Sequence, residues 1–165
     1  MYKATALVLL GLIASASTSE STVKMQLYKT ALSSTASSVS WSECESQRLY
    51  DVACGTASPN PPNVGDFVGL NLDVIFNTDV NVVANMVSVK FTALGSTNPI
   101  NLYTQDFPSG APGDYGAGDE YTDSLTWFIP SFAPLGHYHA QIQVHGTDPV
   151  NDVFACLVAD FDITS

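Results

Sequence analysis

The stretch from Val68 to Phe76 constrains the fold of this 165-residue chain more than any other feature. Side chains alternate between the two faces of a β-strand, so apolar residues at every second position predict a strand with one buried face. The same period recurs in segments 87–91, 125–129, 138–144 and 157–163. We therefore expect several strands around one core. The apolar positions of the first stretch are Val68, Leu70, Leu72, Val74 and Phe76.

Turn-forming residues separate these segments. Pro, Asn and Gly residues in 58–66 and 146–151 predict turns, because they interrupt strand pairing. Shorter stretches at 49–54 and 100–103 predict weaker strands, and residues 106–123, rich in Gly, Pro and Asp, predict a loop. About seven short strands with turns between them are typical of an all-β, antiparallel β-sandwich of two sheets.

The N-terminus predicts a targeting segment. Lys3, an apolar run and the small residues Ala14-Ser15-Ala16 are typical of a secretory signal peptide over residues 1–16. The run is about ten residues long, and a membrane-spanning helix needs about 20. We expect a Ser/Thr-rich, mostly mobile arm at 17–40, with one short strand at Met25–Tyr28, and the β-sandwich domain at 41–165. The predicted location is extracellular or the endolysosomal lumen.

The chain is strongly acidic, with 16 Asp and Glu against 5 Lys and Arg and a formal net charge of −11. Nucleic-acid-binding proteins neutralise phosphates with Lys and Arg, so this balance excludes a nucleic acid partner. It also opposes stable adhesion to anionic membranes, which leaves transient membrane contact. Lys90 is the last basic residue of the sequence.

Three cysteines cannot all pair within one chain, so one is left over. The alternation in the last strand puts Cys156 on the face away from the core. There it can reach a cysteine on an N-terminal segment running over the outside, which favours a Cys44–Cys156 disulfide. Cys54 is then a small buried side chain or, alternatively, a free thiol that links the chain to a disulfide-bonded partner.

No motif of a known catalytic site is present, and we expect neither a cofactor nor enzymatic activity. His137 and His139 share one face of a strand with His145, and Gly136-His137-Tyr138-His139 superficially resembles the metal-binding strand of cupin barrels. Those barrels need a Glu a few residues further on, where this chain has neutral glutamines. A solvated polar face without metal is therefore favoured; a metal site and a pH-sensing role are the alternatives.

Four acids in the predicted loop offer oxygen ligands of the kind that calcium prefers. Their spacing matches no calcium-binding loop, so a solvated acidic loop is favoured. The four are Asp114, Asp119, Glu120 and Asp123.

The order of landmarks along the chain resembles the ML (lipid-recognition) family, which includes the Niemann–Pick sterol carrier and phosphatidylglycerol/phosphatidylinositol transfer proteins. The resemblance covers about Trp41 to Ile163. Its landmarks are Trp41-Ser42-Glu43-Cys44, Ser58-Pro59-Asn60-Pro61-Pro62, Gly65-Asp66, Ile129-Pro130, Gly136-His137-Tyr138 and Asp152-Val153-Phe154-Ala155-Cys156-Leu157. It implies an immunoglobulin-like sandwich that holds a lipid between its sheets, and a disulfide between the first and last cysteines of the domain. The chain departs from the family by lacking a cysteine pair in the 106–123 loop.

Matched by position, the resemblance implies a lipid pocket. Leu102 and Tyr103 belong to the apolar segment that leads into the predicted loop, and Leu135 lies at the mouth of the pocket. Each residue of this set is equally explained as ordinary core. The full set is Phe76, Val89, Phe91, Leu102, Tyr103, Trp127, Leu135, Tyr138, Ile142 and Phe161.

The sequence thus predicts a lipid-binding or lipid-transfer protein that holds one lipid. The expected partner is a sterol, glycolipid or phospholipid. With so few cations, a sterol or other neutral lipid is favoured over a phosphoinositide. The alternative is a structural or adhesive extracellular domain with a solid core and no ligand.

Overall fold

The structure is a computed structural model that describes residues 35–44 and 49–164. The predicted signal peptide, the strand predicted at Met25–Tyr28 and most of the predicted arm lie outside these residues. In the described chain there is no helix, and so none long and apolar enough to cross a membrane. Its strands are β1 (Thr35–Ala36), β2 (Ser40–Glu43), β3 (Tyr50–Ser58), β4 (Phe67–Phe76), β5 (Val80–Ala93), β6 (Ile100–Tyr115), β7 (Glu120–Phe128), β8 (Gly136–His145) and β9 (Val153–Thr164).

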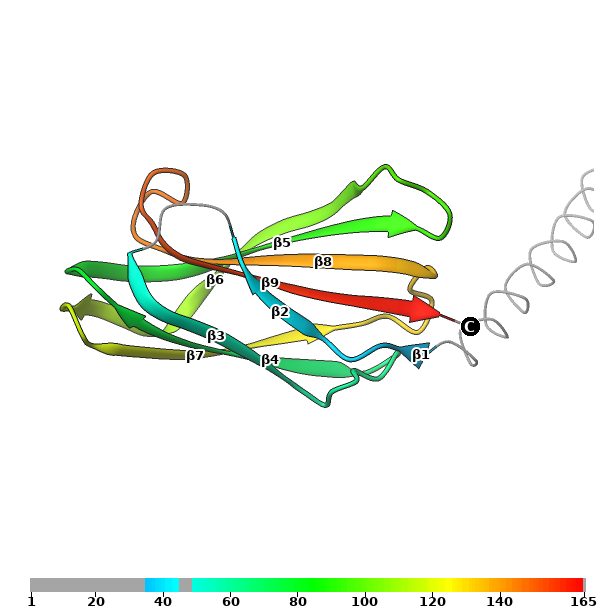
Figure 1. Ribbon diagram of the computed structural model, residues 1–165, viewed down its shortest axis with the longest axis horizontal. Coiled ribbons are helices and arrows are strands. Elements are labelled where there is room, and N and C mark those ends of the chain that lie inside the picture. Colours follow the sequence, from blue (N-terminus) through cyan, green and yellow to red (C-terminus); the bar gives the residue numbers. More distant parts are fainter. Residues whose placement is uncertain (1–34, 45–48, 165) are drawn as a thin grey trace, which may run out of the picture.

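The strands form two antiparallel sheets that lie face to face (Figure 1). The larger sheet has the order β9-β8-β5-β6, and β1 and β2 pair with successive parts of the outer edge of β9. The smaller sheet has the order β3-β4-β7. The all-β, immunoglobulin-like sandwich expected from the sequence is confirmed.

The core lies between the sheets and is built from the alternating residues. The five apolar positions of β4 from Val68 to Phe76 are each 0–3% exposed. Inward-facing side chains of β5, β8 and β9, such as Val89, Ile142 and Phe161, meet them from the larger sheet. Burying an aliphatic or aromatic side chain of this size contributes about 1.5–3 kcal/mol, so this shared face supplies most of the drive for the two sheets to pack.

The prediction of a loop at residues 106–123 is wrong. β6 continues to Tyr115 and β7 begins at Glu120, so only a short turn separates them. In the described chain β6 is an edge strand that pairs with β5 alone. An edge strand tolerates proline because no neighbour needs the N–H on its outer side. Pro108 and Pro112 therefore lie within a strand. Because proline usually interrupts strands, these residues led to the prediction of a loop.

His145 ends the outer face of β8, where the alternation placed it, but it is buried and not solvated as expected. The β8–β9 ladder shifts register between Val144 and His145, and His145 is 3% exposed. Its Nδ1 lies 2.7 Å from the carbonyl oxygen of Gly146, and its Nε2 lies 3.4 Å from a carboxylate oxygen of Asp106. This contact lies on the outer face, because Ala84 and Met86, the β5 partners of His145 and Asp106, alternate with the inward-facing Asn85.

The edge formed by β1 and β2 closes one side of the sandwich. Trp41 of β2 lies directly on Gly55 of β3 in the other sheet, where any Cβ would collide with the indole ring. Val39, between β1 and β2, is part of the core. The packed structure therefore includes residues 35–40, which the sequence had suggested belong to a mobile arm.

The Cys44–Cys156 disulfide is confirmed. Cys44 directly follows β2, its N–H donates to the carbonyl oxygen of Cys156 at 3.1 Å, and the two Cα atoms are 5.4 Å apart. The N-terminal segment thus reaches Cys156 as the edge strand of the sheet, and not by crossing the outside of it as expected. Cys54 is an exposed free thiol, so the expectation that it is buried is wrong.

A buried polar network closes the opposite side. Asn85 of β5 donates to the Tyr121 hydroxyl at 3.0 Å and to the Asp123 carboxylate at 2.7 Å, and both acceptors belong to β7. Ser109 of β6 lies 3.0 Å from the same hydroxyl, and the Gly110 N–H donates to Asp123. Partial burial alone would raise the pKa of Asp123, but the hydrogen bonds it accepts outweigh burial and lower it. The network therefore joins both sheets through an ionised carboxylate.

Candidate functional site

An aromatic cluster of four residues lies inside one end of the sandwich. The ring centroids of Phe91 and Tyr138 are 5.1 Å apart, and Tyr138 stacks on Phe161 at 5.2 Å with an interplanar angle of 11°. Trp127 meets Phe161 edge-on at 5.7 Å. Three of these rings belong to the larger sheet and Trp127 belongs to β7 of the smaller one, so the aromatic cluster spans both sheets.

Strand register explains the cluster. Phe91, Tyr138 and Phe161 are direct partners across β5, β8 and β9, so their side chains form one row on the inner face. Aromatic pairs of this kind contribute about 0.5–1.5 kcal/mol beyond the area they bury. The Tyr138 hydroxyl donates to the carbonyl oxygen of Pro134 at 2.9 Å, and burial raises the pKa of Tyr138 to about 12. The phenol is therefore a neutral polar group beneath the loop that ends the sandwich.

Gly136 lets the chain approach this cluster closely. It begins β8 with φ +152°, and an added Cβ would collide with the carbonyl oxygen of Thr92 and lie 2.8 Å from Cε2 of Phe91. Its neighbour Leu135 is partly buried against the core. The end of β5 and the start of β8 thus meet directly over the Phe91 ring.

The other predicted pocket residues are spread along the interior. Val89 and Ile142 are fully buried in the middle of the larger sheet, and Tyr103 is partly buried against the core. Burial raises the pKa of Tyr103 to about 12. Phe76 lies at the opposite end of the sandwich, where its ring contacts Tyr115 and Tyr121. The structure therefore brings four of the ten predicted residues into one aromatic cluster, with Leu135 at its margin.

The predicted inward position of Leu102 is wrong, because this side chain is 42% exposed. Leu102 and Tyr103 are consecutive residues of β6, and consecutive side chains of a strand point to opposite faces. Tyr103 takes the inner face, so Leu102 takes the outer one.

The space between the sheets is filled by side chains. Val89, Ile142 and Phe76, for example, are each 0–1% exposed. A lipid chain could be held there only if the sheets moved apart at one end or if side chains changed rotamer. Trp127, Leu135 and the adjoining loop are less buried than the middle of the core.

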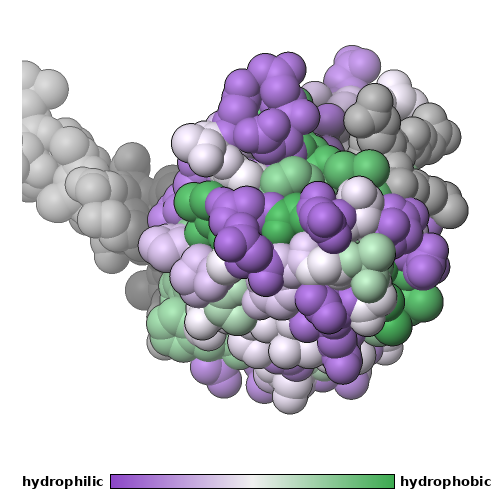
Figure 2. All heavy atoms as spheres, turned by 90° about the vertical axis from the view of Figure 1, so that its left-hand side faces the viewer, coloured by the Kyte–Doolittle hydropathy of each residue, from purple (hydrophilic) through white to green (hydrophobic). Residues whose placement is uncertain are grey.

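The same end carries exposed apolar side chains that the sequence did not single out. In the described chain, six of the nine large hydrophobic side chains that are exposed lie toward the aromatic cluster, and the other three are valines toward the opposite end. The opposite end faces the viewer in Figure 2, where hydrophilic and near-neutral side chains cover most of the surface. The six are Phe67, Leu94, Ile100, Leu102, Phe128 and Phe132; the three are Val52, Val83 and Val150.

The surface has two hollows near residues discussed above. One, of about 330 Å³, lies between the 92–96 turn, Gly136 and the end of β9, beside the aromatic cluster. The other, of about 450 Å³, lies over β2 and β3 and is lined by Trp41, Cys54, Gly55 and Leu157, among others. The first is formed in part by Leu94, which is 78% exposed.

Charge further defines the site. Within residues 35–44 and 49–164, Lys90 is the one Lys or Arg, and it lies on the outer face of β5. An anionic headgroup is usually held by Arg or Lys, and among the described residues the inner face that carries the aromatic cluster has neither.

The four acids proposed as calcium ligands do not come together. Asp114 accepts a hydrogen bond from Asn81, Asp119 accepts one from the Gly116 N–H, and Asp123 belongs to the buried network. Among the described residues, one group of three or more metal-ligating side chains does converge, on the outer face of β8 and β9.

Comparison with solved structures identifies the fold. A Niemann–Pick type C2 protein from the Japanese carpenter ant superposes with a TM-score of 0.50 at 12% identity, over 73% of this chain and 96% of that one. The chain has the fold of a Niemann–Pick type C2 protein. The fold expected from the ML-family resemblance is thereby confirmed.

Two further structures superpose less well. Chicken MD-1 complexed with lipid IVa gives a TM-score of 0.47 at 10% identity, over 79% of this chain and 96% of that one. The C-terminal domain of wzt gives 0.47 at 12% identity, over 74% and 75%. No protein-family model matches the sequence, and no curated protein matches it significantly.

Proposed function

We propose that this protein binds a single lipid, whose apolar chain lies between the two sheets at the aromatic end. The observation that carries the proposal is the joint position of two features on the Niemann–Pick type C2 fold. The aromatic cluster spans both sheets inside one end, and most of the exposed large apolar side chains of the described chain surround that same end. A lipid carrier needs both an apolar interior and a surface that meets the membrane.

The proposed path for the lipid runs between the 92–96 turn and the 129–135 loop. Leu94 and Phe132 at these tips are 78% and 74% exposed, and Leu135 leads from there toward Tyr138. Opening this end would expose the aromatic rings to the incoming chain and leave the buried network at the far end intact. Burial contributes about 0.8 kcal/mol per methylene, so a long chain gives useful affinity without contacts to its headgroup.

The proposed ligand is a neutral lipid such as a sterol or a glycolipid. Among the described residues the one Lys or Arg is Lys90, which lies on the outer face of β5 and not on the inner face with the aromatic cluster, and the whole chain carries a formal charge of −11. The headgroup of a bound lipid would stay near the loops, where the Tyr138 hydroxyl and backbone groups can hydrogen bond to it.

The proposed location is extracellular or the endolysosomal lumen. The Cys44–Cys156 disulfide supports it, because such bonds persist in oxidising compartments. In this proposal the protein acts by binding and carrying, not by catalysis, and it touches membranes transiently through the exposed aromatic end.

One observation favours the second candidate function, a structural or adhesive domain without a ligand. The middle of the interior is filled by side chains that are 0–1% exposed, as in a solid core. The two candidates differ in whether the aromatic end opens.

Native mass spectrometry of the purified secreted chain, followed by lipid extraction, tests the proposal. We expect a species heavier than the chain by one lipid, and a denaturing spectrum of the same sample that shows the bare chain. A folded chain that stays bare after incubation with sterol, glycolipid and phosphatidylcholine would refute lipid binding and favour the structural domain.

A further inference from the structure

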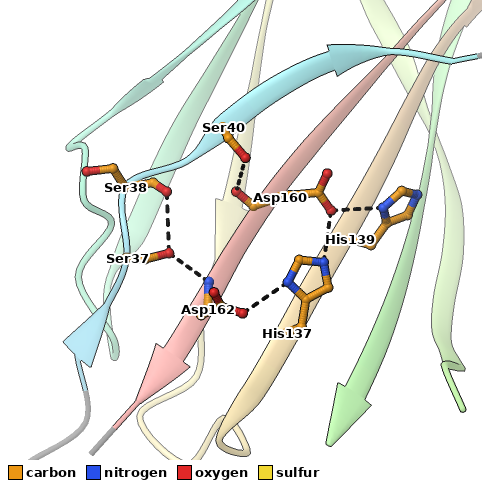
Figure 3. A network of polar contacts seen from close by, with 7 residues as sticks. All are labelled: Ser37, Ser38, Ser40, His137, His139, Asp160 and Asp162. Atoms are coloured by element: carbon orange, nitrogen blue, oxygen red, sulfur yellow. Dashed lines mark hydrogen bonds and ion pairs between the residues drawn. The ribbon is translucent and has the colours of Figure 1, made fainter. Parts of the chain in front are cut away.

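A cluster of histidine and aspartate side chains lies on the outer face of the larger sheet (Figure 3). His137 and His139 are alternate residues of β8, so both point to the same face. Asp162 and Asp160 are their direct partners on β9. Antiparallel pairing therefore gathers two imidazoles and two carboxylates on one outer surface.

Three of these groups converge on one point. Oδ1 of Asp160 lies 2.9 Å from Nδ1 of His139 and 3.1 Å from Nε2 of His137. The three atoms all lie within 4.8 Å of one another. In a tetrahedral zinc site with bonds of about 2.0–2.1 Å, neighbouring ligand atoms are about 3.3 Å apart. The two distances from Asp160 are therefore close to the spacing of neighbouring ligands around one ion.

The fourth group, the Asp162 carboxylate, lies beside His137. The other ring nitrogen of His137, Nδ1, lies 3.0 Å from Oδ1 of Asp162. A neutral imidazole has one N–H and one lone pair, so it cannot donate to carboxylates at both nitrogens. A metal ion at Nε2 would resolve this, because it takes the lone pair that a carboxylate cannot use. With a metal at Nε2, the Nδ1–H donates to Asp162, which is how carboxylates orient metal-bound histidines.

We propose that His137 Nε2, His139 Nδ1 and Asp160 Oδ1 form a binding site for a divalent transition metal of the zinc class. Two imidazoles and one carboxylate are ligands that zinc accepts, with water in the remaining position. The sequence argument against a metal considered carboxylates on the same strand, where glutamines stand. Asp160 supplies it from the neighbouring strand.

The surroundings do not block the site. The side chains of His137 and His139 are 45% and 36% exposed, so an ion can reach them from solvent. Lys90 is the partner of His139 on β5, on the side away from Asp160, and is the nearest Lys or Arg among the described residues. The acidic chain favours accumulation of divalent cations near its surface.

Isothermal titration of the full secreted chain with zinc chloride, together with metal analysis after dialysis, tests the site. We expect one zinc per chain in the wild type. Asp160→Asn and His139→Gln should each weaken binding by at least tenfold, and Asp162→Asn by about 10–100-fold through loss of the orienting bond. Asp51→Asn is the matched control, because it removes an exposed carboxylate of β3 with the same change in net charge.

Circular dichroism should show that all four variants stay folded, because their side chains lie on the surface. Absence of zinc binding by the folded wild type would overturn the proposal. Equal zinc affinity in wild type, Asp160→Asn and His139→Gln would overturn it too, since zinc would then bind elsewhere. Neither outcome depends on whether the chain binds lipid.

Discussion

The proposed membrane-facing end makes a direct prediction about two exposed side chains. Leu94 and Phe132 project from the 92–96 turn and the 129–135 loop, and each is at least 74% exposed. Replacing both with serine removes apolar surface and leaves the core untouched. We expect the Leu94→Ser/Phe132→Ser double variant to bind zwitterionic vesicles, and to load lipid from them, much more weakly than the wild type.

The structure sets the size of this effect. Full burial of a leucine or phenylalanine side chain contributes about 1.5–3 kcal/mol. About three quarters of each side chain is free to insert, which gives about 1–2 kcal/mol each and about 2–4 kcal/mol for the pair if insertion is complete. Each 1.4 kcal/mol changes an equilibrium constant tenfold, so even half-complete insertion predicts at least about a fivefold weakening of vesicle binding.

Flotation with phosphatidylcholine vesicles measures binding, and transfer of a fluorescent sterol between vesicles measures function. The control is the Val83→Ser/Val150→Ser double variant, because Val83 and Val150 are exposed apolar side chains toward the opposite end. The control should bind and transfer like the wild type. Equal losses in both double variants, or no loss in either, would refute the assignment of the membrane-facing end.

Three further predictions follow from the fold. Gly136→Ala should lower the melting temperature by several degrees in differential scanning calorimetry, because its Cβ collides with Thr92 and crowds Phe91; an unchanged melting temperature would contradict this close approach. The pKa of Asp123 is lowered in the folded state, so its contribution to stability is present above the unfolded pKa and is lost as the pH falls through the folded one. As the pH falls from about 5 to about 2, which spans the usual titration range of Asp, the free energy of unfolding of the wild type should therefore decrease more than that of Asp123→Asn in denaturant titrations. Parallel pH profiles of the two proteins would contradict this prediction. Cys54 should react with a maleimide in the folded protein, whereas protection would show that it is buried, and a non-reducing gel of the untreated protein tests whether Cys54 links it to a partner.

Strand periodicity predicted the core well because one buried face leaves a strict pattern. The inward residues of β4 and of the last two strands could be read directly from the sequence. Periodicity failed where a strand lacks that constraint. β6 lies at an edge, mixes Pro and Gly with polar residues and buries little of its surface, so it had the composition of a loop.

Contacts between strands were harder to predict than the strands themselves. Alternation placed His137 and His139 on the outer face of one strand and Asp160 on the outer face of another. Their meeting depends on the register of the β8–β9 hairpin, which the length and geometry of its turn determine. The exposed Leu94 and Phe132 were missed for a related reason, since only the packed fold brings two distant loops to one end.

The most direct test of the account asks where a bound lipid lies. Trp127 belongs to the aromatic cluster, and Trp41 lines the separate hollow over β2 and β3, so the two tryptophans report on the two rival places. A lipid brominated near the end of its acyl chain quenches tryptophan fluorescence at short range, and Trp41→Phe and Trp127→Phe each leave one reporter. We predict quenching of Trp127 in the Trp41→Phe variant and little quenching of Trp41 in the Trp127→Phe variant. Quenching of Trp41 alone, or of neither tryptophan while lipid is bound, would contradict a lipid held between the sheets at the aromatic end.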